Sequence, residues 1–268
     1  MTAVPKPEAP KDAARRLAAG ALREGYRPEA LHEYRDAEGV PLFWRIRLKR
    51  ADGTKWIRPM CDNGGGFRIG EPPAPADGKL LYRLDAIAAA DPAATVIVVE
   101  GEWTADALAK LGMLATTSGS ADSDAAADWS PLADRRVIVW PDHDAPGARS
   151  AKAVADRLRA LGCTVAVIDA AALNLPDKGD AVDWLALHPH ATADDVVALP
   201  SVPAMDHDAR ALAPPDPAWP AATPQPLPPP LPDVPASVPT CCPRPCAAGA
   251  RMPPKACKCR WISPPYPP

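Results

Sequence analysis

Hydrophobic and basic residues alternate over residues 42–60, LFWRIRLKRADGTKWIRPM. A period of two is typical of strands with one buried face, and Ala-Asp-Gly-Thr in the middle supplies turn residues. The pattern therefore predicts a β-hairpin with one apolar face and one basic face. Ahead of it, residues 11–25 place alanines and leucines at helical spacing, which predicts a short helix that packs by one face.

From residue 94 the alternation gives way to short continuous hydrophobic runs, which are typical of strands buried on both faces of a parallel sheet. Strands are predicted at residues 95–100, 113–117, 135–140 and 163–169, and helices at residues 103–112, 147–162 and 180–188. Strands and helices that alternate at this period predict an open, mainly parallel α/β sheet with helices on both faces.

Proline marks a third part of the chain. Of the 37 prolines, 21 follow residue 200, and segments such as PQPLPPPLPDVP favour extended conformations over a packed core. We expect a small α+β region in residues 1–90, the α/β domain in residues 91–200 and a disordered Pro/Cys-rich tail in residues 201–268. Translation out of frame beyond about residue 205 would produce the same abrupt change in composition.

The net charge and the hydropathy of the chain limit the classes of protein to which it can belong. The formal net charge of -3 argues against a uniformly basic nucleic-acid binder, but it leaves room for a local basic surface. The N-terminus is polar and charged, and no run approaches the roughly 18 apolar residues of a membrane span. We therefore expect a cytoplasmic protein with no membrane partner, in which Cys61 and Cys163 are free thiols.

Acidic residues fall where the predicted parallel strands end. Glu100 closes the first strand, Asp142 and Asp144 follow the third, and Asp180 and Asp183 follow the fourth. The carboxyl ends of parallel strands meet at one edge of a sheet. Acidic residues also occur in loops because loops are hydrated, but acidic groups at three strand ends favour a site for one or two hard cations.

Four segments, in this order, resemble the Toprim domain that topoisomerases and bacterial-type primases share: VVEGEWTADAL, TTSGSA, VIVWPDHDAPG and DKGDAVDWL. The forms PDHDAPG and KGDAVDWL are most similar to DNA primases and primase-helicases of phages, plasmids and other mobile elements. The resemblance covers residues 94–190 and implies the Rossmann-like Toprim sheet.

The resemblance also implies a role for each acidic residue. Glu100 would be the general acid/base of nucleotidyl or phosphodiester transfer, and Asp142 and Asp144 would bind the metal. Asp180 and Asp183 correspond to later acidic positions that assist metal or nucleotide binding. The implied cofactor is Mg²⁺, with Mn²⁺ as a substitute.

Two glycines of this chain also match Toprim sequences, and two residues differ from them. Gly101 and Gly119 correspond to glycines that let the backbone pass close to the site. Trp103 and Thr104 stand where many relatives have Lys and Asp. An acidic position in this helix is therefore either shifted to Asp106 or absent.

The basic hairpin is a candidate for nucleic-acid contact. Residues 45–58, RIRLKRADGTKWIR, carry six basic residues and one acid, and aromatic side chains nearby could stack on a base. A solvated antiparallel face would show the same pattern, but YRDAEGVPLFWRIRLKR is similar to a segment that often precedes Toprim in mobile-element primases. The residues assigned to this contact are Arg45, Arg47, Lys49, Lys55 and Arg58.

These features predict a primase-type nucleotidyltransferase that synthesises primers on a single-stranded DNA template from nucleoside triphosphates, with a replicative helicase encoded separately. Two alternatives remain open: a Toprim nuclease that uses the same metals, and a truncated, non-catalytic fragment of a primase-helicase that binds single-stranded DNA. Zinc is not expected, because the cysteines of the tail lack Cys-x-x-Cys spacing and a histidine. Those cysteines include Cys242, Cys246, Cys257 and Cys259.

Overall fold

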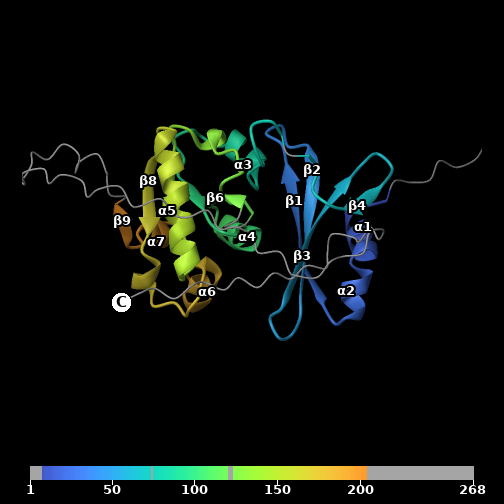
Figure 1. Ribbon diagram of the computed structural model, residues 1–268. Helices are drawn as coiled ribbons and strands as arrows, with labels where there is room; N and C mark the ends of the chain where they lie inside the picture. The colour runs from blue at the N-terminus through green and yellow to red at the C-terminus, as the bar shows by residue number, and fades with distance from the viewer. Residues whose placement is uncertain (1–7, 74, 120–122, 204–268) are drawn as a thin grey trace, which may run out of the picture. The chain divides into compact units, whose positions relative to one another are not determined.

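The computed structural model describes residues 8–73, 75–119 and 123–203, which form two β-sheets and the helices that cover them (Figure 1). The chain divides into two units, Met1–Ala213 and Pro214–Pro268, and all described residues lie in the first unit. The expected boundary near residue 90 thus falls inside the first unit. From residue 204 onward, the expected tail lies outside the described residues.

An antiparallel sheet forms the N-terminal part of the described chain. Its strands are β1 (Arg27–Arg35), β2 (Pro41–Lys49), β3 (Lys55–Asp62) and β4 (Phe67–Ile69), in the order β1-β2-β3-β4. The predicted hairpin is confirmed as β2 and β3, which pair from Trp44 opposite Met60 to Lys49 opposite Lys55. The predicted helix is split into α1 (Pro10–Leu17) and α2 (Ala19–Arg23).

Successive side chains of β2 point to opposite faces of the sheet and pack against two different neighbours. Trp44, Ile46 and Leu48 pack with buried alanines of α1 and α2. Phe43 lies in a core cluster that also contains Ile97 of the second sheet. One face of the antiparallel sheet is therefore covered by its own helices, and the other contributes to the core that it shares with the α/β part.

The second sheet is the α/β sheet that the sequence predicts. Its strands are β5 (Val96–Val98), β6 (Leu114–Thr116), β7 (Arg136–Val139), β8 (Thr164–Ile168) and β9 (Ser201–Pro203), in the order β6-β5-β7-β8-β9. The first four are parallel, and β9 runs antiparallel to β8. The prediction of a mainly parallel sheet is confirmed, although β9 was not predicted.

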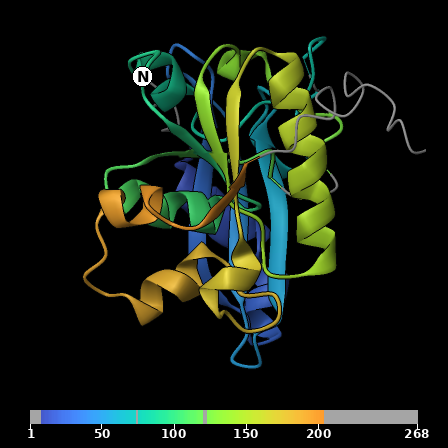
Figure 2. The same ribbon diagram turned by 90° about the vertical axis from the view of Figure 1, so that its left-hand side faces the viewer.

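Helices cover both faces of this sheet, with α5 on one side and α7 on the other (Figure 2). The helices are α3 (Leu84–Ala89), α4 (Glu102–Lys110), α5 (Ala145–Ala160), α6 (Ala181–Leu187) and α7 (Ala193–Val197), with short 3-10 turns η2 (Ser130–Leu132) and η3 (Ala170–Leu173). Val96 and Val98 share a cluster with Val154 of α5, whereas Ile97 shares one with Trp184 of α6. Because successive residues of one strand are buried on opposite faces, the run is continuously hydrophobic.

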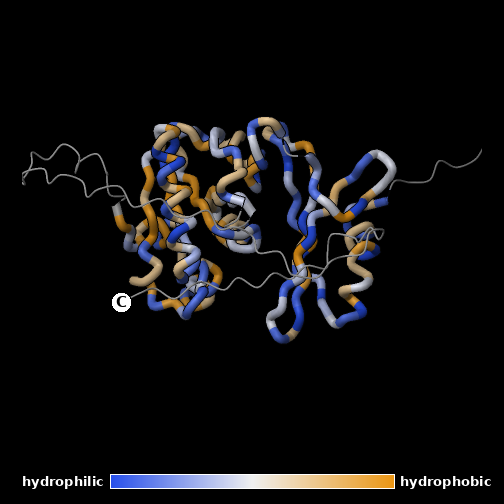
Figure 3. The backbone as a smooth tube through the Cα atoms, in the orientation of Figure 1, coloured by the Kyte–Doolittle hydropathy of each residue, from blue (hydrophilic) through white to orange (hydrophobic). Residues whose placement is uncertain are grey.

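Hydropathy follows this architecture. Hydrophobic colouring is concentrated in the strands of the α/β sheet, and the turn between β2 and β3 is hydrophilic (Figure 3). Within the described residues, no helix is both long enough and apolar enough to span a bilayer.

Candidate functional site

Four carboxylates gather at the carboxyl ends of the parallel strands, and we call this group the acidic edge: Glu100, Asp142, Asp144 and Asp180. Glu100 follows β5, and Asp142 follows β7. Asp144 and Asp180 are the N-cap residues of α5 and α6. The sequence prediction that the strand-end acids lie close together thus agrees with where the structure places these four.

Glu100 and Asp142 approach each other over the first turn of α5. The backbone N–H of Asp142 donates to Glu100 Oε1 at 3.4 Å. Gly147 makes this approach possible, because a Cβ at this position would lie 2.7 Å from Glu100 Oε1 and 2.5 Å from the Asp142 carbonyl oxygen. Gly147 is therefore a site-shaping residue, although the sequence pattern predicted for it only the first position of a helix.

The carboxylates of the acidic edge repel one another. Burial, together with the negative charges of Glu100, Asp180 and Asp144, raises the pKa of Asp142 to about 7, with Lys55 acting in the opposite direction. Burial also raises the pKa of Glu100; the Asp142 N–H opposes this shift, and the nearby charges of Asp144, Asp124 and Asp180 add to it. A bound cation would relieve this repulsion and favour the ionised carboxylates.

Three of the predicted acidic residues also have local structural roles. Asp144 Oδ1 accepts from the Gly147 N–H at 2.7 Å and caps α5. Asp180 and Asp183 form a capping box at the start of α6: Asp180 Oδ1 accepts from the Asp183 N–H, and Asp183 Oδ2 accepts from the Asp180 N–H. Asp183 is exposed and directed at this backbone, so it contributes less to the acidic edge than Asp180 does.

Asp142 differs from these capping residues, because no described residue donates a hydrogen bond to its carboxylate. Among the described residues, no group of three or more Asp, Glu, His or Cys side chains is arranged to hold a metal ion. Mg²⁺ needs only one or two carboxylates and retains several waters. The donor chemistry of the acidic edge therefore fits Mg²⁺, with Asp142 and Asp144 as the residues that would hold it.

A fifth acid, Asp124, lies beside the acidic edge and was not predicted. It is buried, and its carboxylate accepts from the hydroxyls of Ser118 and Ser150. Its negative charge contributes to the raised pKa of Glu100. Asp124 lies in a loop well beyond the end of β6, so it carried no strand-end signal in the sequence.

The acids inside α4 face away from the acidic edge. Asp106 accepts from the Tyr82 hydroxyl at 2.9 Å and lies 2.9 Å from His32 Nδ1 on β1. Glu102 is buried and accepts from the Tyr34 hydroxyl at 2.7 Å. Among the polar residues of α4, Thr104 reaches the acidic edge, where its hydroxyl donates to Asp180 Oδ2 at 3.1 Å.

His143 takes no part in the acidic edge. Its Nδ1 lies 2.9 Å from the Leu175 carbonyl oxygen and 3.1 Å from that of Pro176.

Arg45 lies at the contact between the two sheets. Its guanidinium donates to Glu102 Oε1 at 2.9 Å, to Glu71 Oε1 at 3.1 Å and to the Gly119 carbonyl oxygen at 2.8 Å. Gly119 has a φ of +102°, and a Cβ there would lie 2.7 Å from the guanidinium. Gly119 thus makes room for Arg45. Gly101, in contrast, has no neighbour within 4 Å of a built Cβ, so packing within the protein does not require a glycine there.

The other basic residues of the hairpin have different surroundings. Arg47 pairs with Glu29, and Lys49 Nζ lies 3.8 Å from the same carboxylate. Lys55 is exposed, and its charge opposes the raised pKa of Asp142. Arg58 is also exposed. The predicted basic face is therefore divided into an ion-paired part and a part open to solvent.

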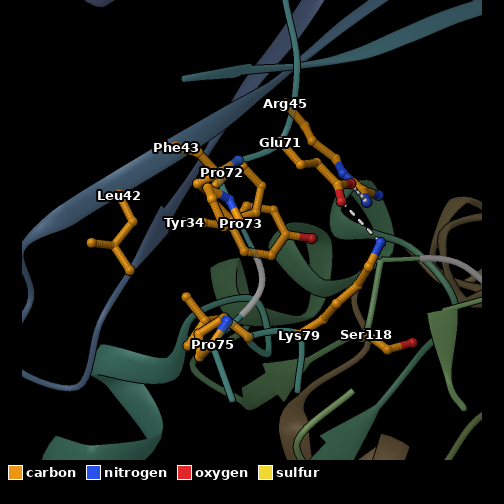
Figure 4. Close-up of a pocket in the computed structure, with 11 residues that line it drawn as sticks. Tyr34, Leu42, Phe43, Arg45, Glu71, Pro72, Pro73, Pro75, Lys79 and Ser118 are labelled. Atoms are coloured by element: carbon orange, nitrogen blue, oxygen red, sulfur yellow. Dashed lines mark hydrogen bonds and ion pairs between the residues drawn. The ribbon is translucent and has the colours of Figure 1, made fainter. Parts of the chain in front are cut away.

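A cavity of about 200 Å³ adjoins Arg45 (Figure 4). The stacked rings of Tyr34 and Phe43, with centroids 4.2 Å apart, line it together with prolines. At one end the Glu71 carboxylate lies between Arg45 and Lys79, and its Oε2 is 2.9 Å from Lys79 Nζ. The cavity is thus apolar, with an ion-paired end.

Comparisons with known proteins give similarity to solved structures but not to protein families. No protein-family model and no curated protein matches the chain. The solved structure of the zinc-binding and RNA-polymerase domains of Aquifex aeolicus primase is similar over 59% of this chain, with 16% sequence identity and a TM-score of 0.39. The similar part spans 36% of the primase chain, and a similarity this distant assigns neither a family nor a function.

Proposed function

We propose that the chain is a magnesium-dependent Toprim protein of the primase type, which synthesises primers on single-stranded DNA by nucleotidyl transfer. The observation that carries this proposal is the acidic edge, in which carboxylates from separate strand ends come together with raised pKa values at Glu100 and Asp142. The order and form of the four Toprim-like segments support it. We place the reaction in the cytoplasm, next to a separately encoded helicase.

Each residue of the acidic edge has a role in this proposal. Asp142 and Asp144 would hold Mg²⁺, which when bound supplies positive charge opposite the triphosphate. Glu100 accepts the proton of the attacking hydroxyl. The hydroxyl oxygen forms a bond to the α-phosphorus, and pyrophosphate leaves. Burial raises the pKa of Glu100 above its usual value, which favours transfer of the proton from the hydroxyl to its carboxylate. Thr104 and the cap of α6 fix the position of Asp180.

The full chain should be tested for primer synthesis with single-stranded template, nucleoside triphosphates and Mg²⁺. The expected product depends on the template and disappears when EDTA is added. Synthesis that is absent with both ribo- and deoxynucleotides would contradict the proposal. Metal-dependent cleavage of plasmid DNA without nucleotides would instead assign the acidic edge to a nuclease.

A further inference from the structure

A groove runs along the exposed side of α4, and we call it the α4 groove. Its volume is about 600 Å³. The residues that define it are Trp103, Asp106 and Lys110 of α4, Glu29 of β1, Arg83, and Val182 of α6. Three elements that are distant in sequence therefore form one groove.

Cations surround an aromatic ring in the α4 groove. The guanidinium carbon of Arg47 lies 5.3 Å from the Trp103 ring centroid, and Lys110 Nζ lies 5.9 Å from it. Trp103 is partly exposed. A ring with cations beside it offers a stacking surface for a base and positive charge for a phosphate.

The two carboxylates of the groove are already paired. Glu29 binds Arg47, and Asp106 Oδ1 lies 3.8 Å from an Arg83 guanidinium nitrogen. Lys110 is exposed and has no carboxylate within ion-pair distance among the described residues. Because Arg47, from outside the lining, pairs with Glu29 and Arg83 pairs with Asp106, Lys110 adds a positive charge, unpaired among the described residues, that favours an anionic ligand.

The α4 groove comes within one helical turn of Asp180, a residue of the acidic edge. Val182 is in the first turn of α6, two residues after the N-cap Asp180. Thr104, the neighbour of Trp103, donates to Asp180 Oδ2 at 3.1 Å. A polymer bound along the groove would thus pass close to Asp180.

We propose that the α4 groove binds single-stranded DNA, with a base stacked on Trp103 and phosphates held by Lys110 and Arg83. This inference rests on the proposed function, because it brings the template strand close to Asp180 of the acidic edge. A single strand matches the groove better than a duplex, because only unpaired bases can stack on a side chain.

Fluorescence anisotropy with a labelled single-stranded oligothymidylate, in EDTA and without nucleotides, tests the groove on the full chain. Trp103→Ala should weaken binding by about 5- to 150-fold, the range for loss of one stacking partner, and Trp103→Phe should restore most of it. Lys110→Glu should weaken binding and lower the slope of log affinity against log salt by about one. Lys152→Glu makes the same charge change on exposed α5 and should leave the affinity unchanged.

Thermal melting of each variant shows whether it is folded. If Trp103→Ala is unfolded, the affinity of Lys110→Glu tests whether the α4 groove binds single-stranded DNA. Wild-type affinity in Trp103→Ala and Lys110→Glu would overturn the inference, as would equal losses in Lys110→Glu and Lys152→Glu or equal competition by duplex DNA. Because the measurement needs no turnover, wild-type protein that binds through Trp103 but makes no primers would overturn only the proposed function. Primer synthesis with normal binding in both groove variants would overturn only the groove.

Discussion

Asp142 combines partial burial with three acidic neighbours, and no described residue donates a hydrogen bond to its carboxylate. Strand ends in the sequence were enough to predict that Glu100, Asp142, Asp144 and Asp180 lie near one another. Asp124 and Gly147 could not be predicted in the same way. Asp124 is brought to the site by the loop after β6, which has no periodic pattern. Gly147 is important because it packs closely against Glu100 and Asp142, and this contact forms only in the folded structure.

The raised pKa of Asp142 predicts a pH-dependent cost in stability. Its pKa rises from 3.8 to about 7 on folding, so the stability associated with the bound proton is present below pH 3.8 and is lost as the pH rises through 7. Without divalent cations, Asp142→Asn should be more stable than the wild type at about pH 8 by about 1–2 kcal/mol, a value reduced for the exposed part of the side chain. Urea denaturation at several pH values measures the difference.

Magnesium provides the control for this pH effect. Mg²⁺ should stabilise the wild type and Asp177→Asn, which changes an exposed aspartate in the loop before α6, but should not stabilise Asp142→Asn. If the wild type and Asp142→Asn respond equally to Mg²⁺, Asp142 does not hold the cation.

Gly147→Ala tests the contact of α5 with the acidic edge. The added Cβ would collide with Glu100 and with the Asp142 backbone, so the variant should lose about 1–3 kcal/mol of unfolding free energy and lose primer synthesis. Gly20→Ala is the matched control, because a Cβ there meets nothing within 4 Å. Equal stabilities of the two variants would show that Gly147 does not shape the site.

At the scale of elements, the hydrophobic pattern predicted those strands and helices whose own sequence has a clear period or hydrophobic run. It missed the strands that form only because they pair with a neighbouring strand. The strands β5 to β8 are continuous hydrophobic runs, and each was predicted within two residues of its ends. β1, RPEALHEYR, contains several helix formers and is a strand because it pairs with β2. β4 and β9 have three residues each, too few to show a period.

Arg45 and Arg58 are a matched pair for testing the role of β2 and β3. Arg45 lies between the sheets, so Arg45→Ala should cost about 3–5 kcal/mol of unfolding free energy by leaving buried Glu102 without its cation. Arg58 is exposed, so Arg58→Ala should change stability by less than about 0.5 kcal/mol. Chemical denaturation compares them, and an equal, small effect would contradict the structural role of Arg45.

At the scale of the whole molecule, the two sheets share one hydrophobic cluster, to which Tyr34 and Phe43 contribute from one sheet and Ile97 from the other. Sequence pattern separated the two parts but contained no information about this shared core, because contacts between distant segments leave no periodic signal. The shared core holds α4 between the antiparallel sheet and α6, with Glu102 on one side and Thr104 on the other. The acidic edge and the α4 groove both depend on this arrangement.

The rate of template-directed primer synthesis by Asp142→Asn plus Asp144→Asn, compared with wild type and Asp177→Asn, tests the central claim most directly. The acidic edge predicts a loss of at least about 100-fold in the double variant, because these two carboxylates would hold the catalytic cation, and no loss in Asp177→Asn. Synthesis by the double variant at the wild-type rate would contradict the assignment of the acidic edge as the active site.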